Sequence, residues 1–128
     1  MAVETFFLAG LVGLAGAAGA LTRYLLSRLI AERARTIFPW ATLTINVSGA
    51  FLIGLLFGLT GRKVIIAQTQ AVLATGFLGG YTTFSTMSWE GVQLLKGGNR
   101  RLSALYLVGN FVPGLLAAAL GMILGGLF

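Results

Sequence analysis

An apolar segment of the chain, residues 64–95, contains a polar stretch with the sequence Gly76-Phe-Leu-Gly-Gly-Tyr-Thr-Thr-Phe-Ser-Thr-Met-Ser-Trp-Glu90. Glu90 is the single charged residue of this segment, so its flanks have the composition of a membrane-spanning helix. Two adjacent glycines are followed by five hydroxyl side chains, those of Thr82, Thr83, Ser85, Thr86 and Ser88. Glycines loosen a helix, and hydroxyls compete for its backbone hydrogen bonds. A kinked helix with hydroxyls bonded to the preceding turn is one interpretation. The density of polar groups favours a broken helix at an ion or substrate site, because irregular backbone in a bilayer must be buried or line a wet cavity.

The composition excludes an ordinary soluble domain. Hydrophobic residues make up 57% of the 128, charged residues 9%, and the mean hydropathy is +0.93. There is no Cys or His, and the three acids are Glu4, Glu32 and Glu90, so thiol chemistry, the usual metal ligands and an enzyme's acid–base pair are not expected. The net charge of +6 comes from residues at the ends of apolar spans, which indicates membrane topology rather than nucleic-acid binding.

Four apolar spans are expected within a single membrane domain, residues 1–128, and they lie at about 5–26, 40–60, 64–95 and 102–128. The predicted fold class is therefore an all-α membrane protein with a third helix broken near its middle. Small residues form a face for close helix contact, with glycines at positions 10, 13, 16, 19, 54 and 58. The amides of Asn46 and Asn110 need partners, because an unsatisfied amide in hydrocarbon costs on the order of several kcal/mol. The glycine faces and these amides together indicate an oligomer, of which a pair of chains is the smallest.

Three motifs occur in order along the chain: Gly16-Ala-Ala-Gly-Ala-Leu-Thr-Arg-Tyr24, Thr42-Leu-Thr-Ile-Asn-Val-Ser-Gly49 and Gly76-Phe-Leu-Gly-Gly-Tyr-Thr-Thr-Phe-Ser-Thr86. With these motifs the chain resembles the Fluc/CrcB fluoride channels over essentially its whole length. The resemblance implies a passive, fluoride-selective channel of the inner (plasma) membrane that exports cytoplasmic fluoride. It also implies an antiparallel, dual-topology dimer with two pores and a structural sodium ion at its centre. The carbonyls of Gly79 and Thr82 are the implied sodium ligands.

The implied pore residues have chemistry that suits a small, strongly hydrated anion: Asn46, Thr83, Phe84, Ser85, Thr86, Met87, Tyr106 and Asn110. Amide and hydroxyl groups offer hydrogen-bond donors, and an aromatic ring such as that of Phe84 presents a positive edge. Weak serial contacts suit conduction better than one deep cationic site. Met87 stands where the family has a second pore phenylalanine, and it lacks a positive ring edge.

Two ionisable residues lie nearest the membrane core. Arg23 either snorkels toward the headgroups or sits in a vestibule where its field concentrates anions. Glu90 would repel fluoride if it were bare in the pore, so we expect it to be hydrogen-bonded near a mouth.

The loop charges are uneven. Six basic residues belong to the first and third loops: Arg28, Arg33, Arg35, Lys96, Arg100 and Arg101. The second loop holds Arg62 and Lys63, so the positive-inside rule puts the six in the cytoplasm and both termini outside. A homodimer is the first expectation, and an antiparallel partner of opposite charge bias is the alternative. A small proton-coupled cation or drug exporter is the competing function, although it would need a carboxylate inside the first span, and Glu4 precedes that span.

Overall fold

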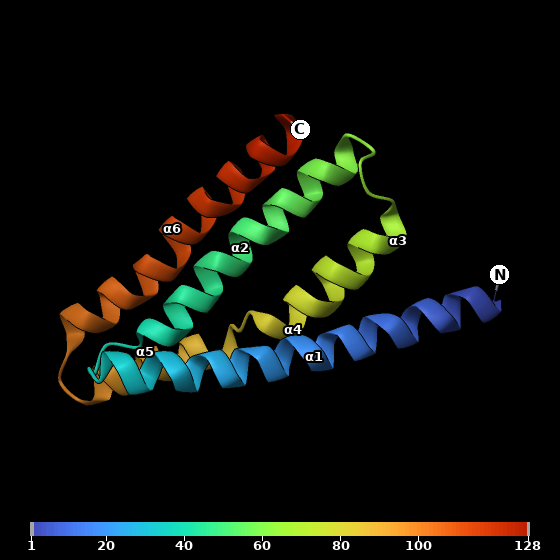
Figure 1. Cartoon of the computed structure of the whole chain (residues 1–128). Helices are drawn as coiled ribbons and strands as arrows, with labels where there is room; N and C mark the ends of the chain where they lie inside the picture. The colour runs from blue at the N-terminus through green and yellow to red at the C-terminus, as the bar shows by residue number, and fades with distance from the viewer. Residues whose placement is uncertain (1, 128) are drawn as a thin grey trace.

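The computed structural model describes residues 2–127. Met1 and Phe128, the two ends of the expected domain, lie outside the described residues. Phe128 is also the last residue of the expected fourth span. The described chain is all-helical, as expected, and its elements are α1 (Ala2–Ala34), α2 (Trp40–Gly61), α3 (Ala67–Gln70), the π-helical segment η1 (Ala71–Leu78), α4 (Gly79–Tyr81), α5 (Ser85–Lys96) and α6 (Arg100–Leu127). Figure 1 shows α2 and α6 running in one direction and α1 and the third span, α3 to α5, in the other.

The first helix is longer than the sequence predicts. Helix α1 continues beyond the expected end at residue 26 and leaves only residues 35–39 as the loop to α2. Residues 27–34 are rich in good helix formers, and Arg28 and Glu32 lie one turn apart at 3.8 Å. A helix can continue beyond the hydrocarbon core of the bilayer, so the length of the apolar run predicts a shorter helix than α1.

Helices α2 and α6 make the most extensive helix–helix contact in the chain. A Cβ atom on Gly54 would collide with the carbonyl of Ala118, and one on Gly121 with the carbonyl of Phe51. The two backbones therefore approach each other at glycines, which confirms the expected small-residue face on α2. This tight pair forms one wall of the site described below.

The third span is broken, as predicted, but two residues later than the glycine pair. Gly79 and Gly80 are still helical, and the chain becomes extended at Thr82, with φ −80° and ψ 158°. Gly80 instead allows close packing, because a Cβ there would meet the backbone of Gly16 on α1. The break therefore follows the glycine pair, as expected, and Gly80 has the additional role of permitting the α1–α4 contact.

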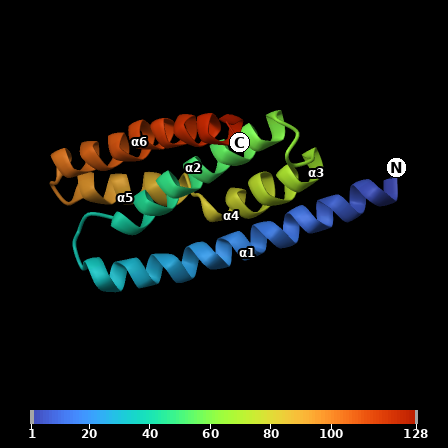
Figure 2. The same ribbon diagram turned by 45° about the horizontal axis from the view of Figure 1, so that its top comes forward.

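Three of the described helices, α1, α2 and α6, are long and apolar enough to cross a membrane, whereas the third span is divided into shorter pieces. Two buried clusters lie on the two sides of the break, one of Ile45, Leu78 and Tyr81 and one of Met87, Leu94 and Tyr106. Figure 2 shows that the α1–α2 and α5–α6 connections lie at the same end of the molecule. All six basic residues of those two regions therefore gather at one end.

Candidate functional site

The side-chain amide of Asn46 forms hydrogen bonds with the backbone at the break in the third span. Its Oδ1 accepts the backbone N–H of Thr83 at 2.9 Å, and its Nδ2 donates to the Thr83 carbonyl at 3.0 Å. Nδ2 also donates to Oδ1 of Asn110 on α6 at 2.9 Å. The pairing with both backbone groups of Thr83 fixes which end of the Asn46 amide is which, and both amide hydrogens have acceptors. Asn46 thus satisfies backbone groups that leaving the helix would orphan.

Thr83 starts the second half of the span. Its hydroxyl accepts the backbone N–H of Thr86 at 3.1 Å, which caps the first turn of α5, and lies 3.4 Å from the hydroxyl of Ser85. Thr83 is buried, whereas Ser85 and Thr86 are exposed on this single chain. The three hydroxyls predicted for the pore therefore occupy one turn, with the buried one at its base.

Glu90 is hydrogen-bonded, as expected, and one turn of α5 separates it from Thr86. Its Oε1 accepts the hydroxyl of Thr42 at 2.6 Å and that of Tyr106 at 2.9 Å. Tyr106 is fully buried, and its carbonyl accepts Nδ2 of Asn110 at 2.8 Å. A polar network thus links Thr83, through the two asparagines, to the backbone carbonyl of Tyr106, and the hydroxyl of the same tyrosine bonds the Glu90 carboxylate.

Thr42 is a member of this network that the sequence did not single out. It is 4% exposed and lies four residues before Asn46 on α2, so both side chains are on the same helix face. The sequence signal that could have identified Thr42 is its i, i+4 spacing from Asn46, an asparagine inside an expected membrane span.

Phe84 and Met87, the two residues expected at the aromatic positions of the pore, have opposite environments. Phe84 is 69% exposed, whereas Met87 is 4% exposed. Both line a groove of about 290 Å³ together with Asn46, Thr83, Asn110 and Phe111. The ring of Phe84 therefore lies on the surface of the single chain, and the thioether of Met87 is buried inside the chain.

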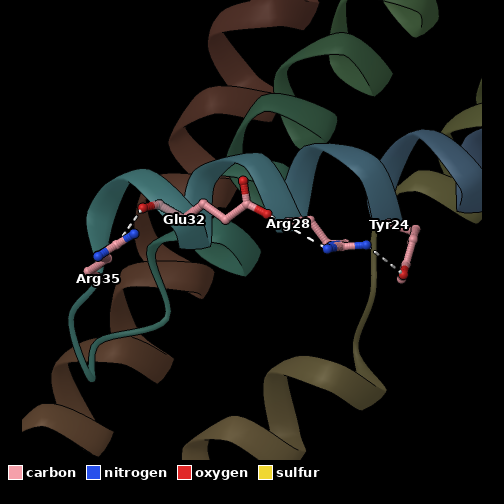
Figure 3. A network of polar contacts seen from close by, with 4 residues as sticks. All are labelled: Tyr24, Arg28, Glu32 and Arg35. Atoms are coloured by element: carbon pink, nitrogen blue, oxygen red, sulfur yellow. Dashed lines mark hydrogen bonds and ion pairs between the residues drawn. The ribbon is translucent and has the colours of Figure 1, made fainter.

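Arg23 lines a second cavity, of about 230 Å³, together with Thr42, Thr83 and Thr86. The half-buried arginine is thus placed beside the hydroxyl turn. Figure 3 shows that its neighbour Tyr24 belongs instead to a surface chain of contacts, in which Arg28 donates to the Tyr24 hydroxyl at 3.4 Å and Arg35 to the Glu32 carbonyl at 3.0 Å. These side chains are exposed, so their contacts add little stability.

The carbonyls of Gly79 and Thr82 have lost their helical donors. In a regular helix the N–H of Thr83 would bond the Gly79 carbonyl, and the N–H of Thr86 would bond the Thr82 carbonyl. Here the first N–H is donated to Asn46 and the second to the Thr83 hydroxyl. The two carbonyls that the resemblance assigns to sodium are therefore both released from α-helical pairing.

The fold and the network define a multi-spanning membrane protein whose third span is interrupted at a polar site. The chain belongs to the CrcB family: it matches the family described as CrcB-like protein, Camphor Resistance (CrcB), over residues 10–122.

Its relatives include proteins named fluoride-specific ion channel. The chain is 44% identical over 115 residues to Fluoride-specific ion channel FluC 2 of Moorella thermoacetica, covering 90% of this chain and 93% of the relative. It is 44% identical over 116 residues to the FluC protein of Thermus thermophilus, covering 91% and 93%. It is 48% identical over 123 residues to that of a Hydrogenobaculum species, covering 94% and 98%. The resemblance drawn from the three motifs is confirmed, and these relatives are named as channels rather than enzymes.

Proposed function

We propose that this chain is a passive, fluoride-selective ion channel of the bacterial plasma membrane, through which cytoplasmic fluoride leaves the cell. The observation that carries the proposal is the clamp between Asn46 and Thr83, which holds a turn of hydroxyls beside a groove in the middle of an apolar span. The names of the relatives support fluoride as the ion.

The exposed hydroxyls and the aromatic edge supply the contacts for a dehydrated anion. Both hydrogens of the Asn46 amide are already donated, so in this conformation Asn46 acts by holding Thr83 in place. The hydroxyls of Thr83, Ser85 and Thr86 can turn toward the ion, and the edge of Phe84 adds a weak positive contact. Met87 lines the same groove with a polarizable thioether instead of a ring.

The two ionisable residues beside the network, Arg23 and Glu90, fit anion passage. Arg23, beside Thr83 and Thr86, forms the vestibule and raises the local anion concentration through its field. The hydroxyls of Thr42 and Tyr106 donate to the Glu90 carboxylate, so its charge does not face the ion without hydrogen-bond partners. Tyr106 and Asn110 continue the polar path between Glu90 and the clamp.

An antiparallel homodimer is the assembly that we propose. Its support in this structure is the 69% exposure of Phe84 and the open groove beside it, because a dry pore needs a second wall there. An antiparallel chain would bring the same groove from the opposite side. The alternative partner is a related chain of opposite topology, since the six-to-two charge imbalance favours one orientation for this chain.

A structural sodium ion fits the released carbonyls. Gly79 and Thr82 of the two chains would hold it, and uncharged carbonyl oxygens suit a monovalent hard cation. Such an ion would be coordinated by four carbonyl oxygens that have no water to bind them. It would therefore stabilise the broken third spans of the two chains.

The sodium proposal is tested by thermal unfolding of the purified dimer. The melting temperature is expected to rise with NaCl and not with choline chloride at equal ionic strength, because a ligand that binds only the native state stabilises it. Identical curves in the two salts would contradict a structural sodium ion.

The channel proposal is tested in liposomes loaded with potassium fluoride. A potassium ionophore should start fluoride release, read with a fluoride electrode, without any proton gradient. No fluoride release, together with transport of an organic cation that requires an imposed proton gradient, would instead support the small proton-coupled exporter.

A further inference from the structure

A cavity of about 500 Å³ opens at the basic end of the molecule, between the α1–α2 loop and α5. Its lining includes Phe38 and Trp40 from the loop region and Glu90, Gln93 and Asn99 from the opposite side. Glu90 therefore borders this cavity while its Oε1 accepts the hydroxyl of the fully buried Tyr106. A side chain must separate the cavity from Tyr106, and the α1–α2 loop supplies that side chain.

The loop holds Phe38 in one conformation. Pro39 has φ −78° and ψ 71°, and the N–H of Trp40 donates to the Phe38 carbonyl at 2.8 Å, which together make an inverse γ-turn. The hydroxyl of Thr36 donates to the same carbonyl at 3.2 Å. Proline keeps its own φ in this range, and the two hydrogen bonds to the Phe38 carbonyl hold the backbone that carries the Phe38 ring.

The ring of Phe38 packs directly on the tyrosine. The ring centroids of Phe38 and Tyr106 are 5.6 Å apart with an interplanar angle of 90°, the favourable edge-to-face arrangement. On another side the ring contacts Trp40, with centroids 4.6 Å apart. Phe38 also packs against the buried cluster of Met87, Leu94 and Tyr106.

We propose that Phe38 is a positioning residue of the ion path: it holds the Tyr106 hydroxyl on Glu90 and keeps water in the cavity of about 500 Å³ away from that hydrogen bond. With the ring removed, Tyr106 gains freedom and water competes for Oε1 of Glu90. The carboxylate is then less firmly held and opposes the passage of an anion more strongly. The effect on flux depends on the proposed channel function, whereas the packing role does not.

The packing role is measured by hydroxyl-radical footprinting of the purified dimer, read by mass spectrometry. In Phe38→Ala the labelling of Tyr106 is expected to rise several-fold, because the cavity then reaches its ring. Tyr81 is the internal control, since it is buried in the other cluster and should keep its labelling. Unchanged Tyr106 labelling, or an equal rise at Tyr81, would overturn the proposal. Phe38→Leu, which keeps apolar volume without a ring, is the second variant if the alanine variant does not assemble.

The functional role is measured by fluoride efflux in a double-mutant cycle with Tyr106→Phe. Phe38→Ala alone should lower efflux by about two- to tenfold, the rate equivalent of one aromatic pair. In the Tyr106→Phe background the same substitution should have almost no effect, since the hydroxyl that it positions is gone. A full effect in both backgrounds, or none in the native background, would refute the positioning role. Wild-type protein that passes no fluoride would instead reject the proposed function, and the footprint would still decide the packing role.

Discussion

Asn46→Ala is expected to reduce fluoride efflux by at least about 100-fold. The substitution removes the acceptor for the Thr83 N–H and the donors to the Thr83 carbonyl and to Asn110. Each polar group left unsatisfied in a buried site costs about 1–3 kcal/mol, and about 2.7 kcal/mol corresponds to a factor of 100 in rate. Without the clamp Thr83 has no fixed position, so the hydroxyl turn that it begins is displaced from the groove.

The measurement is initial fluoride efflux from liposomes at matched dimer content. Thr44→Ala is the control, because Thr44 is exposed on the same helix two residues away. Asn46→Asp should also be severely impaired, since it keeps one acceptor but loses both donors and adds a negative charge. Wild-type efflux from a correctly assembled Asn46→Ala dimer would mean that the amide only joins helices.

The sequence predicted the break and most residues around it, because the signals are local. Two glycines followed by hydroxyls inside an apolar run cannot form an undisturbed membrane helix, and the structure is extended at Thr82. What the sequence could not supply was the partner of each group. Asn46 and Thr83 are 37 positions apart, and only the packing of α2 against the third span brings them together.

The errors have equally physical causes. Apolar length gave the end of the expected first span, but α1 continues through eight residues with good helix propensity. The packing role of Gly80 was also missed, because its contact with Gly16 is a long-range requirement with no local signal. Thr42 and Phe38 were not singled out because their roles depend on Glu90 and Tyr106, which are distant in sequence.

The selectivity of the path has the second large expected effect. The hydroxyl turn beside the groove of about 290 Å³ and the absence of a cationic side chain among the described residues that line it favour a small anion with strong hydrogen bonds. Chloride is larger and accepts weaker hydrogen bonds, so it gains less from the hydroxyls on losing its water. Fluoride should therefore pass through the reconstituted protein at least about 100-fold faster than chloride, a difference of about 2.7 kcal/mol between the two barriers.

Fluoride selectivity is measured by parallel efflux of fluoride and of chloride from liposomes loaded with each potassium salt. Release is started with a potassium ionophore and read with ion-selective electrodes. The expected result is rapid release of fluoride and chloride release no faster than from protein-free liposomes. Comparable release of the two ions, or no fluoride release from liposomes that contain correctly assembled dimer, would contradict a fluoride-selective channel.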